Sequence, residues 1–195
     1  MTLTLSEVQF NLTKVDFTTL PKPRKNKGVR GQLLELALGI PNSSKLTDMV
    51  DGELKSFTKG ESIAVTQLKH TLPQIFNKTP FSQTKIGIKL QQTLYVGFDR
   101  QNNFLGTTTL TPDTNPKHYE LLQNDYDFIA NRIRESFYNK SELHTTNGLN
   151  GLLQIRTKDS KDRNGNYHPI YWKGQKMTNK GFAFYLTGKY AKSII

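Results

Sequence analysis

Residues 27–57 read KGVRGQLLELALGIPNSSKLTDMVDGELKSF, and this stretch decides the fold that we expect for the chain. The apolar run VRGQLLELALG is typical of a helix, and it ends at Gly39 and Pro41, which are helix-stop signals. NSSKLTDMVDG is rich in turn residues, and we interpret GELKSF as a strand. The stretch therefore predicts a helix, a turn and a strand in succession.

Two carboxylates in this stretch, Asp48 and Glu53, precede Lys55 in the pattern D-x₄-E-x-K. Side chains alternate along a strand, so Glu53 and Lys55 project to one face while Leu54 turns into the core. Asp48 lies in the turn that leads into this strand. Two converging carboxylates suit Mg²⁺, which prefers oxygen ligands. Such an ion lowers the pKa of a water and offsets charge on a scissile phosphate, and a lysine beside it helps to hold that phosphate.

The same pattern has a purely structural interpretation, because an acidic residue followed by E-x-K also forms ordinary ion pairs on a solvated surface. Glu35 is the only charged residue in QLLELALG, and charged side chains are seldom fully buried without a partner. Gln32, Glu35 and Gly39 form a polar stripe that faces either water or the acidic cluster. In the second case Glu35 is a third carboxylate near the metal.

Further along the chain, ESIAVTQL reads as a strand, and we predict a hairpin with GELKSF that turns at Thr58, Lys59 and Gly60. TLYVGFD and NFLGTTTLT predict a second hairpin that turns around residues 100–102. Apolar residues recur at helical spacing from about His118 to Tyr138, which predicts an amphipathic helix. LLQIRTK and GFAFYLTG read as strands, and the polar KDSKDRNGNYHP between them as a loop. Strands and helices alternate, so the fold class is mixed α/β or α+β.

The strand LLQIRTK places Gln154, Arg156 and Lys158 on one face and apolar side chains on the other. Arginine pairs with guanine and glutamine with adenine, so this face could reach base edges and phosphates. The alternative is a solvated edge strand whose cations discourage aggregation.

The charged-residue composition of the chain favours a polyanionic partner. Lys and Arg number 27 against 16 Asp and Glu, a formal charge of +11. A basic surface of this kind binds nucleic acid by releasing counterions, with a membrane surface as the lesser competitor. There are no cysteines and the four histidines are scattered, so we expect no thiolate or histidine metal site. No signal peptide or stretch of membrane-spanning length is evident, and we expect a cytoplasmic protein without a membrane partner.

Several of these motifs together resemble one known family. KGVRGQLLELALG, SSKLTD and GELKSF, followed in order by LLQIRTK and KGFAFYL, resemble the MutH-type branch of the PD-(D/E)XK nucleases. That branch contains a mismatch-repair nicking enzyme and restriction endonucleases that cut GATC. The resemblance runs from about residue 26 to the C-terminus and is thin at about 66–84 and 159–176.

The resemblance implies a role for each matching residue. It assigns four residues to the catalytic cluster, with the metal on Asp48 and Glu53: Glu35, Asp48, Glu53 and Lys55. Lys89 matches a family lysine that precedes a strand and assists near the scissile phosphate. Arg156 and Lys158 match residues that contact DNA, and Tyr185 matches a tyrosine linked to adenine and its methylation. Packing beside Phe182 and Phe184 is the alternative for Tyr185.

Two departures from the family pattern leave alternatives open. Members often have more residues between the metal aspartate and the glutamate, which makes Asp51 a rival ligand; we prefer Asp48 because it follows the Ser-Lys block. The family's Arg-Pro-Lys is Arg156-Thr157-Lys158 here, which leaves the backbone freer and the exact recognition sequence open.

The resemblance implies a PD-(D/E)XK core in which a mixed sheet flanked by helices is split into two lobes around a DNA cleft. We expect one nuclease domain over 1–195, with an N-terminal arm or helix at 1–27, a catalytic lobe at about 28–110 and a recognition lobe at about 111–195. The expected function is that of a Mg²⁺-dependent type II restriction endonuclease on double-stranded DNA, GATC being the expected target, beside a cognate methyltransferase. A mismatch-repair nickase activated by a MutL-like protein is the close alternative.

A catalytically inactive DNA-binding module of the same fold is a further alternative, although such modules usually lose the E-x-K pair. An RNA-binding protein has less support, because no RNA-binding signature with stacking aromatics is evident.

Overall fold

The structure is a computed structural model that describes residues 3–20, 28–41, 45–159 and 161–195. The α-helices are α1 (Leu5–Leu12), α2 (Gly28–Ala37), α3 (Leu72–Phe76), α4 (Lys85–Gln91), α5 (Pro116–Tyr138) and α6 (Gly188–Ile194), with 3₁₀ turns at Leu68–His70 and Phe81–Gln83. The strands are β1 (Glu53–Thr58), β2 (Ile63–Gln67), β3 (Thr93–Phe98), β4 (Phe104–Leu110), β5 (Thr146–Asn147), β6 (Leu153–Thr157), β7 (Ile170–Trp172), β8 (Gln175–Thr178) and β9 (Phe182–Leu186). The fold class is mixed α and β, as the sequence predicts.

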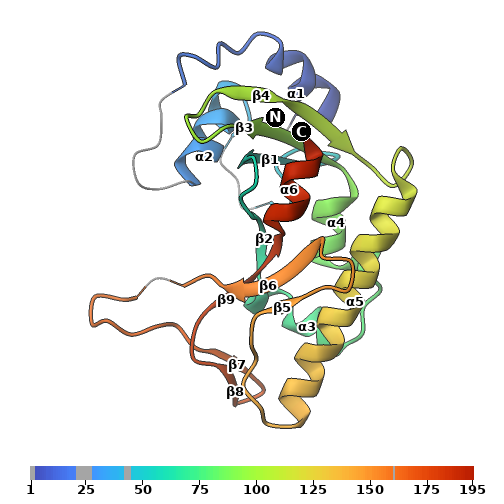
Figure 1. Cartoon of the computed structure of the whole chain (residues 1–195), viewed down its shortest axis with the longest axis vertical. Coiled ribbons are helices and arrows are strands. Elements are labelled where there is room, and N and C mark those ends of the chain that lie inside the picture. The colour runs from blue at the N-terminus through green and yellow to red at the C-terminus, as the bar shows by residue number, and fades with distance from the viewer. Residues whose placement is uncertain (1–2, 21–27, 42–44, 160) are drawn as a thin grey trace.

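One sheet carries β1, β3 and β4 in that order, with β1 parallel to β3 and β4 antiparallel to it. Helices α1 and α2 cover one face of this sheet (Figure 1). Leu34 of α2 and Leu38, which directly follows this helix, pack there with Leu54 of β1 and Leu94 of β3 in a small separate core. Strand β1 lies at an edge of this sheet, so side chains from both faces and from the preceding turn can meet beside it.

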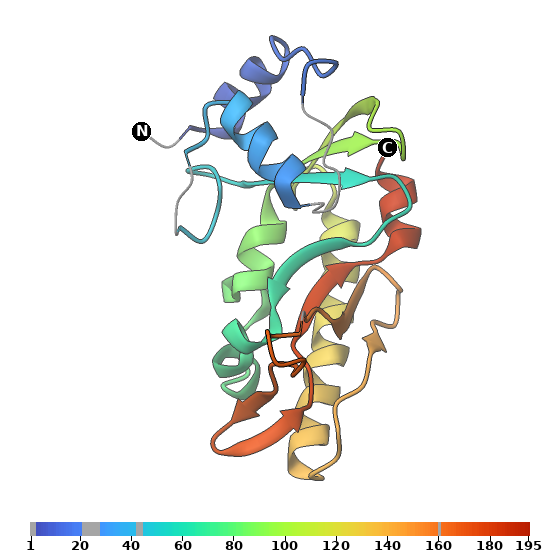
Figure 2. The same cartoon turned by 90° about the vertical axis from the view of Figure 1, so that its left-hand side faces the viewer.

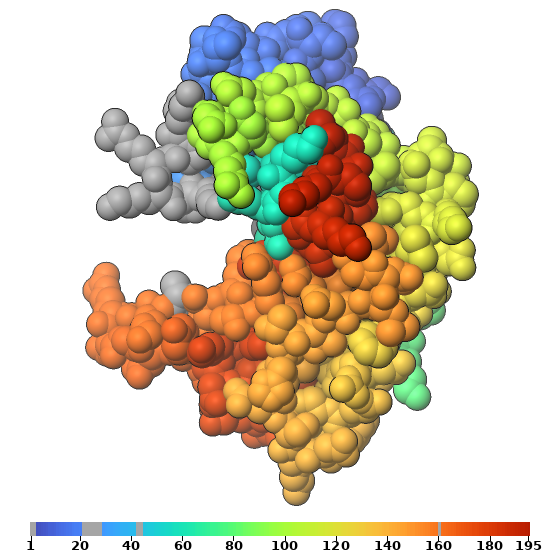
Figure 3. All heavy atoms as spheres, viewed as in Figure 1, coloured from blue at the N-terminus to red at the C-terminus, as the bar shows by residue number. Residues whose placement is uncertain are grey.

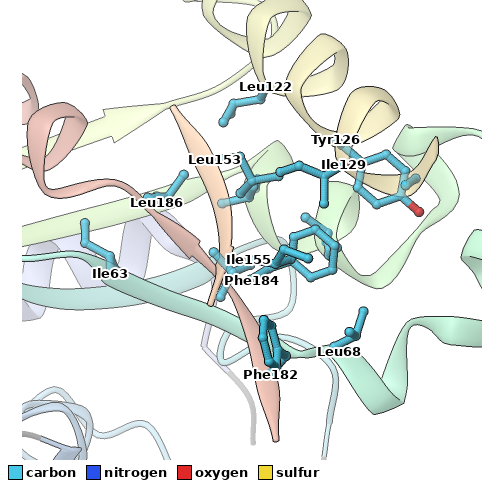
Figure 4. Packing of buried hydrophobic residues seen from close by; sticks show 14 of the residues in the cluster. Ile63, Leu68, Leu122, Tyr126, Ile129, Leu153, Ile155, Phe182, Phe184 and Leu186 are labelled. Atoms are coloured by element: carbon cyan, nitrogen blue, oxygen red, sulfur yellow. The ribbon is translucent and has the colours of Figure 1, made fainter. Parts of the chain in front are cut away.

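A second sheet carries β2, β9, β6 and β5, all antiparallel. The long helix α5 lies across one face, and the main core fills the space between them (Figure 4). Leu153 and Ile155 of β6, Phe184 of β9 and Ile129 of α5 are fully buried there. The side chains that alternate with these core residues lie on the opposite face of the sheet. Arg156 and Tyr185 are among them.

The predicted hairpin between GELKSF and ESIAVTQL is wrong. β1 pairs with β3 and β2 pairs with β9, so the two strands belong to different sheets. The turn at Thr58, Lys59 and Gly60 redirects the chain from one sheet to the other. Alternation in a sequence identifies a strand but carries no information about its partner, and this explains the error.

Other predictions for the elements are confirmed. The helix before Gly39 is α2, and Gly39 has a positive φ of 80°. The hairpin around residues 100–102 is β3–β4, and the amphipathic helix is α5. The N-terminal arm at 1–27 contains α1, while its basic segment at 21–27 lies outside the described residues. None of the helices in the described part of the chain is long and apolar enough to cross a bilayer.

The two sheets meet at an angle and leave one side of the molecule hollowed, as Figure 3 shows on its left-hand side. Figure 2 looks onto that side, with α2 above and β2 and β9 below it. The candidate site lies at this hollow.

Candidate active site

Glu53 is the centre of the candidate site. It is the first residue of β1 and is only 1% exposed. Its Oε1 accepts a hydrogen bond from Lys55 on the same face of the strand and another from Lys89 Nζ at 2.6 Å. The predicted alternation of Glu53 and Lys55 around Leu54 is therefore confirmed, and Lys89 lies beside them although it is 36 residues from Glu53 in the sequence.

Local structure brings Lys89 to this position. Helix α4 is capped by Thr84, whose hydroxyl accepts a hydrogen bond from the N–H of Gly87. The helix leads directly into β3, which runs parallel to β1 in the register Glu53 to Thr93. Gly52 lies where the two strands begin, and a β carbon there would approach the carbonyl oxygen of Gln92 to 2.8 Å. The GELK motif therefore requires glycine at its first position.

The turn before β1 separates the two rival aspartates. Asp48 Oδ2 accepts a hydrogen bond from the N–H of Leu54 at 3.0 Å, which holds this carboxylate against β1 beside Glu53. Burial and the charge of Glu53 raise the pKa of Asp48, against the opposing effect of Lys55. Asp51 is exposed, and its Oδ1 accepts a hydrogen bond from the N–H of Leu5 in the first turn of α1 at 2.7 Å. Asp48 belongs to the cluster, and Asp51 tethers α1.

Glu35 faces the cluster instead of bulk water. Its side chain is half-buried on α2. Burial and the charge of Asp48 raise the pKa of Glu35, while Lys55 opposes the shift. Gln32, the other polar residue of the predicted stripe, is exposed, so the stripe is divided between the cluster and water.

One oxygen of Glu53 is left for a further ligand. Within the described residues, Glu53 Oε2 is buried and has no hydrogen-bond partner. A buried carboxylate oxygen without a partner is costly, and a cation bound there would satisfy it. The same residues contain no group of three or more acidic or histidine side chains arranged to hold an ion. Mg²⁺ does not require such a group, because it is commonly bound through one or two carboxylates, waters and a substrate phosphate.

A cleft of about 760 Å³ connects this cluster with the second sheet. Glu35 and Lys55 line one wall, and Arg156, Lys158 and Tyr185 line the other. Residues from the two blocks at opposite ends of the sequence therefore share one cavity, which lies on the hollowed side of the molecule (Figure 3).

Strand β6 is not a bare edge strand. It pairs with β9 along its length and with β5 at Gln154 and Ile155. Leu153 and Ile155 point into the core and are fully buried, while Gln154 and Arg156 are half-buried on the other face. The predicted alternation is confirmed. Gln154 and Ile155 lie between two strands, whereas Arg156 and Thr157 pair with β9 alone, so the edge-strand alternative stays open for the cationic end of β6.

Tyr185 alternates with Phe184, so its ring lies on the cleft side and not in the main core. The guanidinium of Arg156 stacks on that ring, with 4.4 Å between its carbon and the ring centroid. Burial raises the pKa of Tyr185, and the charge of Arg156 opposes this. Tyr185 is only 8% exposed, so most of its surface packs against neighbours, which include the guanidinium of Arg156.

Lys158 follows β6 and is exposed at the mouth of the cleft. Partial desolvation of its ammonium lowers the pKa of Lys158, and the charge of Lys55 lowers it further. Two cations from opposite walls therefore act on each other across the cleft, and an anion between them would relieve their repulsion.

No protein-family model matches this chain, and no curated protein matches it either.

Arg30 lines the cleft and was not singled out by the sequence analysis. It is 8% exposed, its guanidinium donates to Thr58 and to Asn102, and it stacks on Phe98. These contacts fix α2, and with it Glu35, against the sheet. The sequence signal that could have identified Arg30 is its position as a charged residue at the start of an otherwise apolar helix.

Proposed function

We propose that this chain is a Mg²⁺-dependent, site-specific DNA endonuclease of the MutH type. One observation carries the proposal. The five residues suggested for catalysis come from α2, the following turn, β1 and α4, and they meet beside a cleft whose opposite wall is cationic. Phosphodiester hydrolysis requires acidic metal ligands, cations for the phosphate and a surface that binds DNA.

Asp48 and Glu53 are the proposed metal ligands. The buried Oε2 of Glu53 has no hydrogen-bond partner among the described residues, and burial together with the charge of Glu53 raises the pKa of Asp48. A cation between these two carboxylates would stabilise both of them. A divalent cation held by this pair supplies Lewis-acid stabilisation of the charge that builds on the phosphate oxygens.

Lys55 and Lys89 are the proposed phosphate-binding residues. Both ammonium groups donate to the same oxygen of Glu53, so they lie together next to the proposed metal ligand. Lys55 also lines the cleft and can reach a phosphate that enters it. Glu35 lines the cleft beside this cluster and is proposed as a third carboxylate of the catalytic site.

The opposite wall is the proposed recognition surface. Arginine reads guanine through two parallel hydrogen bonds, and lysine contacts either guanine or a phosphate. The ring of Tyr185 holds Arg156 in place by stacking, which reduces the freedom that binding would otherwise cost. Arg156, Lys158 and Tyr185 are therefore proposed to read the target, which the family resemblance suggests is GATC.

The two sheets and their separate cores support a two-lobed PD-(D/E)XK architecture in which DNA lies between a catalytic and a recognition lobe. A type II restriction endonuclease with a cognate methyltransferase is the favoured biological role. A mismatch-repair nickase with a MutL-like activator uses the same chemistry and differs in its products and partners.

Digestion of plasmid DNA in the presence of Mg²⁺ tests the proposal. Unmethylated, hemimethylated and fully methylated plasmids would be incubated with the purified chain, and the product ends sequenced. We expect cuts at one short sequence, with a dependence on adenine methylation. Linear products indicate a restriction enzyme and nicked circles a strand nickase. Intact plasmid in all three methylation states contradicts the proposal.

A further inference from the structure

A basic arm extends from the recognition sheet next to the cleft. Residues 161–168 lie between β6 and β7, and every one of them is exposed. Figures 1 and 3 show this segment projecting from the sheet on the hollowed side of the molecule. The arm adjoins Lys158, which lines the cleft, so the arm continues the cationic wall outward.

The base of the arm is held closed by Asp159. One carboxylate oxygen accepts hydrogen bonds from the N–H groups of His168 and Gly181 at 2.7 and 2.8 Å, and the other contacts His168 Nδ1 at 2.9 Å. Burial opposes the charge of Asp159, but these hydrogen bonds outweigh it and lower its pKa to about 2. The two ends of the arm are therefore tied to the same carboxylate.

The tip of the arm is also ordered by a carboxylate. Asp162 Oδ1 accepts hydrogen bonds from the N–H groups of Asn164 and Asn166 at 2.8 and 2.9 Å, and its own N–H donates to the carbonyl of Asn166. Gly165 supplies the positive φ of 81° that this turn requires. Both acidic groups thus point at backbone N–H groups of the arm.

The Tyr167 ring of the arm contacts two lysines, one in the arm and one outside it. Lys161 lies 5.4 Å from the centroid of the Tyr167 ring, and Lys180 lies 4.9 Å from the same centroid. Arg163 is exposed near the tip. The tyrosine therefore gathers two ammonium groups, while the carboxylate of Asp162, the acidic residue of the arm, accepts hydrogen bonds from N–H groups of the arm itself.

We propose that the arm 161–168 binds the sugar–phosphate backbone of duplex DNA beside the segment held in the cleft, through Lys161 and Arg163. This inference rests on the proposed function, because it requires duplex DNA in the cleft. A duplex fits better than an isolated anion or an acidic peptide, since the arm follows closely after Lys158, which lines the cleft, and a long polyanion in the cleft could reach both. The ordered base and tip mean that little conformational freedom is lost when phosphates bind.

Phosphate contacts position DNA but carry no sequence information, so the arm adds affinity equally on all sequences. Removal of each cation should reduce the salt dependence of binding, because fewer counterions are released. This signature separates the arm from the base-reading wall of the cleft.

The test compares Lys161→Ala and Arg163→Ala with Lys117→Ala, a matched loss of one exposed cation on α5, which lies on the opposite side of the molecule (Figure 1). Binding of the full chain to short duplexes with and without GATC would be measured over a series of salt concentrations, with Ca²⁺ in place of Mg²⁺ to prevent cleavage. We expect each arm variant to bind both duplexes more weakly, and the slope of log affinity against log salt to fall by about one unit per cation. Lys117→Ala should match the wild type.

Three outcomes overturn the inference. Arm variants that match Lys117→Ala in affinity and slope show that the arm does not touch DNA, and the proposed function survives if the wild type still cleaves. A loss confined to the GATC duplex shows base reading instead of phosphate binding. A wild-type chain that neither binds nor cleaves any duplex overturns the arm and the proposed function together.

Discussion

At the scale of the residue, Glu53 combines two properties that seldom occur together. Its side chain is almost completely buried, yet one oxygen accepts hydrogen bonds from two lysines while the other has no partner among the described residues. Burying charged groups costs desolvation free energy, and the attraction between the charges often fails to offset it. A buried ionic group is therefore weak evidence for a role in stability alone. The proposed binding of a metal ion and a phosphate at this site would account for the arrangement.

The two aspartates of the turn provide the sharpest residue-level prediction. Asp48→Asn should lower the rate of Mg²⁺-dependent cleavage by roughly 100-fold or more, because even groups that only orient metal ligands cost 10–100-fold when they are lost. Asp51→Asn should cleave like the wild type, since an asparagine oxygen can still accept the hydrogen bond from Leu5. Single-turnover cleavage of one duplex by both variants is the measurement. The reverse ranking would mean that Asp51 is the ligand.

Tyr185→Phe removes one hydroxyl from the recognition wall. The ring that supports Arg156 remains, so the melting temperature should stay close to that of the wild type. We expect a changed ratio of cutting rates on methylated and unmethylated duplexes, because Tyr185 lines the cleft that is proposed to hold the target. An unchanged ratio together with a lower melting temperature would make Tyr185 a packing residue.

At the scale of the element, a buried carboxylate on α5 fixes the turn before the recognition strand. Asp125 is completely buried and accepts hydrogen bonds from the N–H groups of Asn150, Leu152 and Leu153 at 2.6–2.9 Å. Gly148 lies so close that a β carbon there would meet the carboxylate at 2.1 Å. Helix α5 therefore sets where β6 begins, and through it the position of Arg156.

Asp125→Ala should destabilise the chain by about 3 kcal/mol, because three backbone N–H groups, of which that of Leu153 is fully buried, lose their acceptor. Asp125→Asn keeps one acceptor oxygen and should lose less. Urea denaturation of the wild type and both variants gives the free energies of unfolding. A loss below about 1 kcal/mol for the alanine variant would show that water replaces the carboxylate.

The sequence predicted most elements but not their partners. Helix α5 was visible in its apolar spacing, and Asp125, three residues after Leu122 on the same face, was a visible exception to that spacing. The hairpin of β1 with β2 was wrong because strand pairing depends on the whole sheet. Strands β7 and β8 were missed because they have only three and four residues, too few to show an alternating pattern.

The candidate site was predicted better than the topology. Ordered motifs identified all five residues around Glu53, and the structure brings them together. The sequence could not decide between Asp48 and Asp51 or fix the direction of Glu35, because both depend on how α1 and α2 pack on the sheet. It also could not show that Tyr185 supports Arg156.

At the scale of the whole molecule, the two sheets place the carboxylate cluster with its lysines on one side of the cleft and the cations Arg156 and Lys158 on the other. The cluster around Glu53 lies on the sheet that carries α1 and α2, and the cations lie on the sheet that carries α5. The formal charge of +11 favours approach of a polyanion, while the carboxylates locally repel it unless a cation is bound. Binding and cleavage should therefore respond differently to the same substitution.

Glu53→Gln separates these two responses and tests the central claim most directly. Cleavage and binding of one duplex by the wild type and this variant would be measured side by side, cleavage with Mg²⁺ and binding without any divalent cation. We expect Glu53→Gln to lose cleavage and to bind DNA at least as tightly as the wild type, because an anion has been removed from a phosphate-binding surface. Cleavage by Glu53→Gln at the rate of the wild type would contradict the account.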